Sequence, residues 1–117
     1  MISLEIAPRA RRDLDSIFTD SHNRFGALAA VRYRRLVAEA LRDLRLSPNR
    51  LGVAINPDLP TGLRLYHLRY SRSAASGRIG RPRHLIAFKV TAGGLVVVRV
   101  LHDAMDIPRH LSAESRA

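Results

Sequence analysis

The chain has 117 residues, a length typical of one domain, and the 46% of its residues that are hydrophobic can supply a core. Its formal net charge is +10, and it contains nineteen arginines, one lysine and no cysteine. Disulfides and thiolate chemistry are therefore excluded, and the lack of a signal-peptide pattern or a membrane-length apolar run predicts a cytoplasmic protein. The preference for Arg suits bidentate contacts to phosphate or carboxylate, or reflects a GC-rich genome.

The N-terminal part predicts a strand and then a helix. Apolar and polar residues alternate over residues 2–6, which is typical of a half-buried strand. Pro8 suits the first turn of a helix, which we expect to end near His22 or Asn23. Two ion pairs are expected on the solvent-facing side of this helix, Arg9 with Asp13 and Arg11 with Asp15.

A second, longer helix is predicted after a break at Phe25 and Gly26. It begins at Ala27 and is closed by Ser47 and Pro48. Its apolar residues recur at helical spacing, namely Ala30, Tyr33, Leu36, Val37, Ala40, Leu41 and Leu44. The two helices should form a hairpin that buries these apolar stripes.

The second half of the chain predicts three more strands and a short helix. The strands are expected at 63–70, 83–91 and 95–102, with loops at 49–62 and 71–82. The loop at 71–82 is rich in Ser, Gly and Arg and is expected to be mobile. A hairpin turn over 92–94 should require a positive φ. Asp106 is expected to cap the last helix, with Pro108 in its first turn, and residues 112–117 should be frayed.

The resulting order is β-α-α-β-β-β followed by a small helix. This predicts a single α+β domain over residues 1–117, in which a helical hairpin packs on a small, mainly antiparallel sheet.

Positive charge is concentrated over residues 59–102, which include no acidic residue. The basic residues of this segment are Arg64, Arg69, Arg72, Arg78, Arg81, Arg83, Lys89 and Arg99. We expect these charges to lie on the sheet without a counter-charge, so the likeliest partners by charge are a polyanion, an acidic protein or both in turn.

The end of the last strand carries the most specific motif of the chain. Residues 99–106 run Arg-Val-Leu-His-Asp-Ala-Met-Asp, and Arg109-His110-Leu111 follow. Together with residues 83–90, the helical hairpin and the start of the second strand, this motif resembles the RelE/ParE superfamily of toxins, and it looks closest to the ParE branch. The resemblance covers roughly residues 4–111.

The resemblance implies that the chain is the toxin of a type II toxin–antitoxin pair and that this toxin inhibits DNA gyrase. It also implies a cognate antitoxin, with a dimeric DNA-binding part that carries the complex to operator DNA and an acidic C-terminal segment that wraps the toxin. No cofactor, metal or membrane partner is expected. The residues predicted to contact the target or the antitoxin are Arg64, Arg69, Arg83, Lys89, Arg99, His102, Met105, Asp106 and Arg109.

The alternative is a RelE-type, ribosome-dependent mRNA endonuclease, which needs an acid/base pair and cations for the phosphate. Its candidate residues would be His102, Arg99 and Arg83. The strand at 63–70 has no carboxylate, and Asp103 stands where such enzymes have Tyr, so the set is incomplete.

Several of these side chains also have structural interpretations. His102 could bond Asp103 or Asp106 and cap the last helix. Tyr33 fits the core better than a site, whereas Tyr66 and Tyr70 share one strand face and could pack under the helices or stack on a base.

Overall fold

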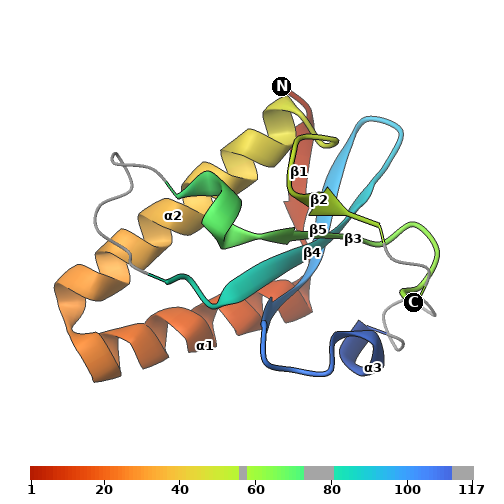
Figure 1. Cartoon of the computed structure of the whole chain (residues 1–117). Coiled ribbons are helices and arrows are strands. Elements are labelled where there is room, and N and C mark those ends of the chain that lie inside the picture. Colours follow the sequence, from red (N-terminus) through yellow and green to blue (C-terminus); the bar gives the residue numbers. More distant parts are fainter. Residues whose placement is uncertain (56–57, 73–80, 112–117) are drawn as a thin grey trace.

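The computed structural model describes residues 1–55, 58–72 and 81–111 (Figure 1). Two long helices form a hairpin beside a five-stranded sheet, and a short third helix follows the last strand. In chain order the elements are β1 (Ser3–Ile6), α1 (Pro8–Phe25), α2 (Ala27–Leu46), β2 (Val53–Ala54), β3 (Arg64–His67), the 3-10 helix η1 (Leu68–Ser71), β4 (His84–Val90), β5 (Gly94–His102) and α3 (Ile107–Leu111).

The helical hairpin turns at a single residue, Gly26, as the sequence predicts. Its φ of 92° is a conformation that residues with a Cβ rarely adopt. The N–H of Gly26 donates to the carbonyl of His22 at 2.9 Å, so α1 continues to Phe25, beyond the expected end near His22 or Asn23. Pro8 occupies the first turn of α1, as expected.

The sheet has the order β1-β5-β4-β3-β2. The three predicted C-terminal strands form an antiparallel meander, and β1 pairs in parallel with β5 from Ser3↔Gly94 to Ile6↔Val97. One strand lies in the predicted loop 49–62, because Val53 and Ala54 pair with Tyr66 and Leu65. A two-residue strand is too short to show a periodic pattern.

Two local expectations were wrong. The strand predicted over 63–70 ends at His67, whose Nδ1 accepts a hydrogen bond from the Arg69 N–H at 3.1 Å and turns the chain into η1. The β4–β5 turn contains no positive φ at Gly93 or Gly94. Gly94 lies close to the neighbouring strand instead, because an added Cβ would meet Oγ of Ser3 and would lie 3.0 Å from its carbonyl oxygen.

Both faces of the sheet are covered. The helical hairpin packs on one face in a core that includes Leu36, Leu44 and Phe88. A smaller core on the other face joins Leu101 of β5 to Leu111 of α3. Among the described residues, no helix is long and apolar enough to cross a membrane.

The tyrosines of the second predicted strand separate. Tyr66 is fully buried, and its hydroxyl is bonded to Oγ of Ser71 at 2.7 Å, whereas Tyr70 lies on η1 and is 41% exposed. Burial raises the pKa of Tyr66, and the hydrogen bond to Ser71 partly offsets that effect. Tyr66 is therefore a core residue, as one of the two interpretations held.

Candidate functional site: a basic cleft between the helical hairpin and the sheet

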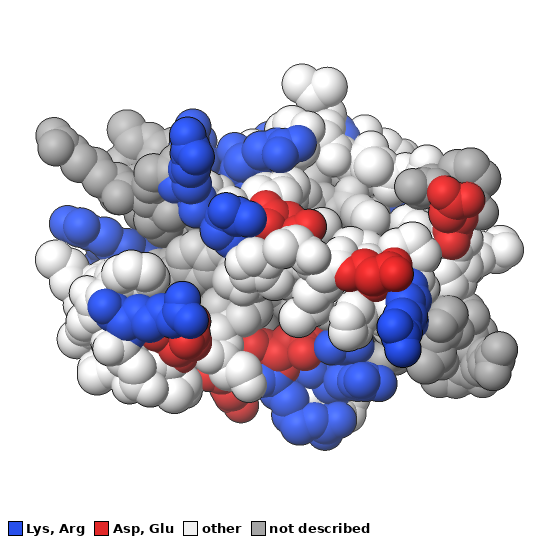
Figure 2. Space-filling model, turned by 60° about the horizontal axis from the view of Figure 1, so that its bottom comes forward, with Lys and Arg blue, Asp and Glu red and all other residues white. Residues whose placement is uncertain are grey.

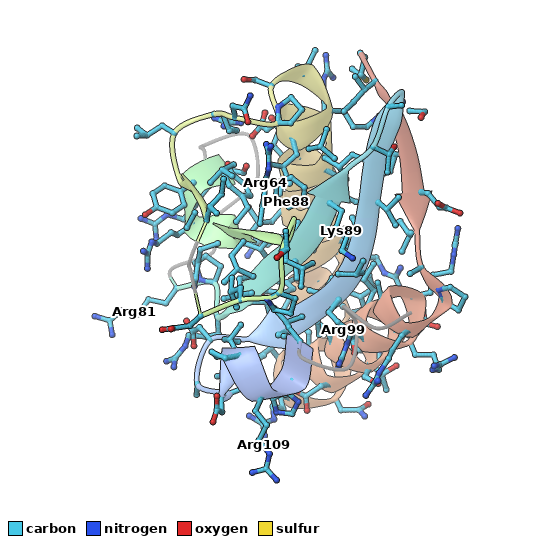
Figure 3. All side chains as sticks on the ribbon, turned by 90° about the vertical axis from the view of Figure 1, so that its right-hand side faces the viewer. Arg64, Arg81, Phe88, Lys89, Arg99 and Arg109 are labelled. Atoms are coloured by element: carbon cyan, nitrogen blue, oxygen red, sulfur yellow. The ribbon has the colours of Figure 1, made fainter. Side chains whose placement is uncertain are left out.

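Arg99 is buried, which argues against a direct contact with a target. Its Nε donates to Oδ2 of Asp13 at 2.8 Å, and one terminal nitrogen donates to Oδ1 of the same carboxylate at 3.1 Å. Asp13 Oδ2 also accepts from the Val100 N–H at 3.0 Å. Figure 3 shows Arg99 beside α1. This pair joins α1 to β5, because it ties the Asp13 carboxylate of the helix to the Arg99 side chain of the strand.

Asp103 receives two basic side chains at the end of β5. His67 Nε2 lies 3.0 Å from Oδ2, and Arg83 Nε donates to Oδ1 at 3.1 Å. Burial by itself would raise the pKa of Asp103, but the hydrogen bonds from His67 and Arg83 outweigh it and hold the pKa below its usual value. Asp103 therefore pairs with Arg83, whose side chain remains 55% exposed.

The positive charge of residues 59–102 is thus partly compensated from outside the segment. Asp13 pairs with Arg99, and Asp103 pairs with Arg83. Figure 2 shows Lys and Arg in several separate groups on one face, with Asp and Glu between them. The expectation of a sheet surface without counter-charge was wrong, because the sequence segment does not include the acidic residues that fold against it.

His102 ends β5 instead of capping the last helix. Its Nδ1 accepts from the Ala104 N–H at 3.0 Å and lies 3.6 Å from Asp103 Oδ1. Asp106 is the cap of α3, as the sequence predicts, since its Oδ1 accepts from the Arg109 N–H at 3.4 Å.

Tyr33 and His84 form a second pair, 51 positions apart in sequence. The Tyr33 hydroxyl lies 2.6 Å from His84 Nδ1, and it also accepts from the Arg83 N–H at 3.3 Å. Burial raises the pKa of Tyr33 to about 12. Burial and the neighbouring His102, whose ring lies edge-on 5.2 Å away, lower the pKa of His84 to about 4. Tyr33 therefore belongs to the site as well as to the apolar stripe of α2.

These side chains border a cleft of about 680 Å³ between the hairpin and the ends of β4 and β5. Its lining residues are Ile17, Asp20, Ser21, Arg24, Phe25, Ala29, Arg32, Tyr33, Arg81, Arg83, His84 and His102. A smaller cleft of about 280 Å³ adjoins it and is lined by His67, Arg69, Arg72, Arg81, Pro82, Arg83 and Asp103. Arg81 and Arg83 border both.

The structure brings only some of the predicted contact residues together. Arg83 and His102 share the larger cleft, and Arg69 lies at the smaller one. Arg64 on β3 is bonded to the Asn49 side chain, and Lys89 is half-buried on β4. Met105, Asp106 and Arg109 lie exposed at α3, with Arg109 pointing outward in Figure 3. Within the part of the chain that is described, no three His, Asp or Glu side chains are placed to hold a metal ion.

The sequence did not single out Arg24 or Arg32 as site residues, and it named Arg81 only as one of the basic residues of segment 59–102. Arg24 and Arg32 lie on separate helices, and Arg81 lies in the predicted basic loop, of which residues 73–80 fall outside the described part. Only the packing of the hairpin on the sheet brings them to one cleft. A local charge pattern contains no such signal.

Residues 4–107 match the family described as ParE toxin of type II toxin–antitoxin system, parDE. The chain belongs to the ParE toxin family. It is 31% identical over 107 residues to toxin ParE1 of Mycobacterium tuberculosis, in strains CDC 1551 / Oshkosh and ATCC 25618 / H37Rv. That match covers 91% of this chain and 94% of the relative. The resemblance inferred from the end of the last strand is thereby confirmed.

The fold is also found in a known structure. A chain of the chromosomal ParDE toxin–antitoxin system from P. aeruginosa matches with a TM-score of 0.62 over 87% of this chain and 96% of its own length. The two sequences are 19% identical, so the likeness concerns the fold. The predicted α+β architecture, with a helical hairpin on a small sheet and a short C-terminal helix, is confirmed.

Proposed function

We propose that this ParE-family toxin arrests growth by inhibiting DNA gyrase in the cytoplasm, without catalysing RNA cleavage. The family match over residues 4–107 carries the proposal. The cleft offers a poor acid/base pair, which supports it further. Its carboxylate, Asp20, is paired with Arg24 at 3.2 Å, and His84 has a pKa of about 4, far from the value near 7 that suits proton transfer.

The rival endonuclease would use Arg99 together with Arg83 and His102. The Arg99 guanidinium is instead held by Asp13 and its side chain is 8% exposed. An arginine in this position supports the α1–β5 contact and cannot reach a substrate phosphate without breaking that contact. Arg83 and His102 do share one cleft, and that single observation favours the rival function.

A cognate antitoxin is the expected partner. The chain carries a net charge of +10, which an acidic segment would neutralise. Large apolar side chains are exposed at the turn of the hairpin and in the loop after α2, with Phe25 72% exposed and Leu51 90% exposed. A segment that folds on binding gains its affinity from such apolar contacts. The complex would reach operator DNA through the DNA-binding part of the antitoxin.

The target is tested by expressing the toxin and scoring growth, gyrase supercoiling and cleavage of ribosome-bound mRNA in parallel. The variant His102→Gln keeps hydrogen bonding but cannot titrate, so it should remain toxic. Arg109→Glu, on the exposed surface of α3, should reduce toxicity strongly while antitoxin binding and the circular dichroism spectrum report that it folds. Deleting residues 107–117 should also reduce toxicity strongly, but it removes the buried Leu111 and so tests folding as well.

One result would replace gyrase with the ribosome as the target. In that result the unchanged toxin cleaves ribosome-bound mRNA. The His102→Gln variant folds and binds antitoxin, but it no longer cleaves mRNA and has lost all toxicity.

A further inference from the structure

We propose that the larger cleft is a binding site for a phosphate group carried by a nucleotide or a nucleic-acid strand. The inference concerns the toxin's own surface and does not rest on gyrase being the target. Four arginines and two histidines line the cleft, namely Arg24, Arg32, Arg81, Arg83, His84 and His102. Among the described residues that line it, the one carboxylate is Asp20, which forms an exposed ion pair with Arg24 and offsets the charge of that arginine.

The ring of His84 is fixed in one protonation form by Tyr33. The Tyr33 oxygen accepts a hydrogen bond from the Arg83 N–H, so its own proton is directed to His84 Nδ1, 2.6 Å away. A neutral imidazole that accepts at Nδ1 carries its proton on Nε2. The lowered pKa of His84 keeps the ring neutral at physiological pH, so its remaining ring nitrogen is a donor.

His102 is fixed in the same form by the backbone. Its Nδ1 accepts from the Ala104 N–H at 3.0 Å, which leaves Nε2 as the protonated nitrogen. The rings of His84 and His102 lie 5.2 Å apart at an interplanar angle of 85°. The two imidazoles together therefore supply N–H donors and no ring acceptor to a molecule that enters the cleft. An anion with several acceptor oxygens matches this set, whereas a ligand that donates does not.

The guanidinium groups favour phosphate over a carboxylate. Asp103 holds Arg83 through Nε, the nitrogen nearest the side-chain stem, at 3.1 Å. Arg81 and Arg83 border both clefts, and Arg69 and Arg72 border the smaller one. A terminal phosphate offers three acceptor oxygens to such donors, whereas a carboxylate offers two, and a strand offers two at each of its successive phosphodiesters. Successive phosphates of one strand would follow the arginines from one cleft to the other.

The remaining lining suits the organic part of such a ligand. Ile17, Phe25, Ala29 and Tyr33 give the cleft an apolar side, and its volume of about 680 Å³ is in the range of small-molecule sites. A nucleobase can lie against aromatic side chains of this kind. A mononucleotide would bind in the larger cleft only, whereas a strand would extend through both clefts.

The test uses the full-length toxin with three probes: inorganic phosphate, adenosine 5′-monophosphate and a ten-nucleotide single-stranded DNA. Long-range ¹H–¹⁵N NMR of the histidines should show His84 and His102 as Nε2–H tautomers before any probe is added. Every probe that binds should shift the resonances of both rings. Saturation by the monophosphate identifies a nucleotide site, and much tighter binding of the DNA identifies a strand.

Three variants separate this site from diffuse attraction to a basic protein. Arg81→Gln should weaken binding by about tenfold, as expected for loss of one charge-assisted hydrogen bond. Tyr33→Phe should release His84 from its single tautomer and weaken phosphate binding by a similar factor. The control Arg42→Gln removes the same charge from an exposed position of α2 that does not line either cleft, and it should change affinity by less than about twofold.

Two outcomes would overturn the proposal. Equal loss of affinity in Arg81→Gln and Arg42→Gln would mean that the probes are attracted by net charge alone. Histidine shifts caused by an acidic peptide but by none of the three phosphate probes would assign the cleft to a protein partner. If Tyr33→Phe fails to fold, the exposed Arg81 and Arg42 variants still decide the matter.

Discussion

Removal of the Asp13 carboxylate should strongly destabilise the fold. Asp13→Ala deletes three hydrogen bonds at 2.8, 3.0 and 3.1 Å and removes the Asp13 charge from the Arg99 guanidinium, whose side chain is 8% exposed. Breaking a buried ion pair from one side costs about 3–5 kcal/mol. Because 1 kcal/mol shifts the melting temperature of a domain of this size by roughly 4 °C, we expect a loss of about 12–20 °C.

Thermal and urea unfolding followed by circular dichroism measure this effect. Asp15→Ala is the matched control, because Asp15 is two residues away on the same helix and exposed, and it should change stability by about 0.5 kcal/mol or less. The double variant Asp13→Ala/Arg99→Met replaces the pair by apolar groups and should recover much of the loss. Equal melting temperatures for Asp13→Ala and Asp15→Ala would refute the argument that this pair fastens α1 to β5.

Three further predictions concern the core, the pH dependence and the charge. Leu44→Ala, at a fully buried position of α2, should cost about 2–5 kcal/mol, whereas Leu46→Ala, 59% exposed two residues later, should cost well under 1 kcal/mol in the same unfolding assay. The pKa of His84 is lowered from 6.5 in the unfolded chain to about 4 in the folded chain, so the unfolded chain binds the proton more tightly. The contribution of neutral His84 to the free energy of unfolding is therefore complete above pH 6.5 and is lost as the pH falls toward 4. It should amount to about 2 kcal/mol after allowance for partial exposure, and it should vanish from the pH profile of His84→Gln; identical profiles would contradict it. The isolated toxin should bind DNA non-specifically with an affinity that falls steeply with salt, and retention on a DNA column that is insensitive to salt would argue against electrostatic binding.

The sequence predicted those parts of the fold that local chemistry determines. Gly26 marks the hairpin turn because the backbone there needs a positive φ, and Asp106 marks the start of α3 because its carboxylate caps the helix. The strand β2 was not predicted, because its two residues are too few to show an alternation of apolar and polar side chains in the sequence. Gly94 was assigned to the turn by its residue type. In the fold it lies against Ser3, which is far away in sequence but belongs to the adjacent strand β1.

The candidate site was less predictable because its geometry is non-local. Arg83 and His102 were singled out from the motif, and they do share a cleft. The charge of Arg99 is visible in the sequence, but its burial follows from an Asp13 that lies 86 positions away. Tyr33 fits the apolar stripe of its helix, and nothing in that stripe shows that its hydroxyl meets His84. Pairings of this kind become visible only when the hairpin is placed on the sheet.

The parallel pairing of β1 with β5 also sets the order in which a newly made chain can fold. Ser3 pairs with Gly94, which lies 91 positions later, whereas the partners within the helical hairpin are neighbours in sequence. At about 5–20 residues per second, a ribosome needs roughly 5–18 s to make the intervening chain, and helices form within microseconds. The residues of the hairpin are therefore made seconds before β5, so their apolar side has no complete sheet to pack on during this interval.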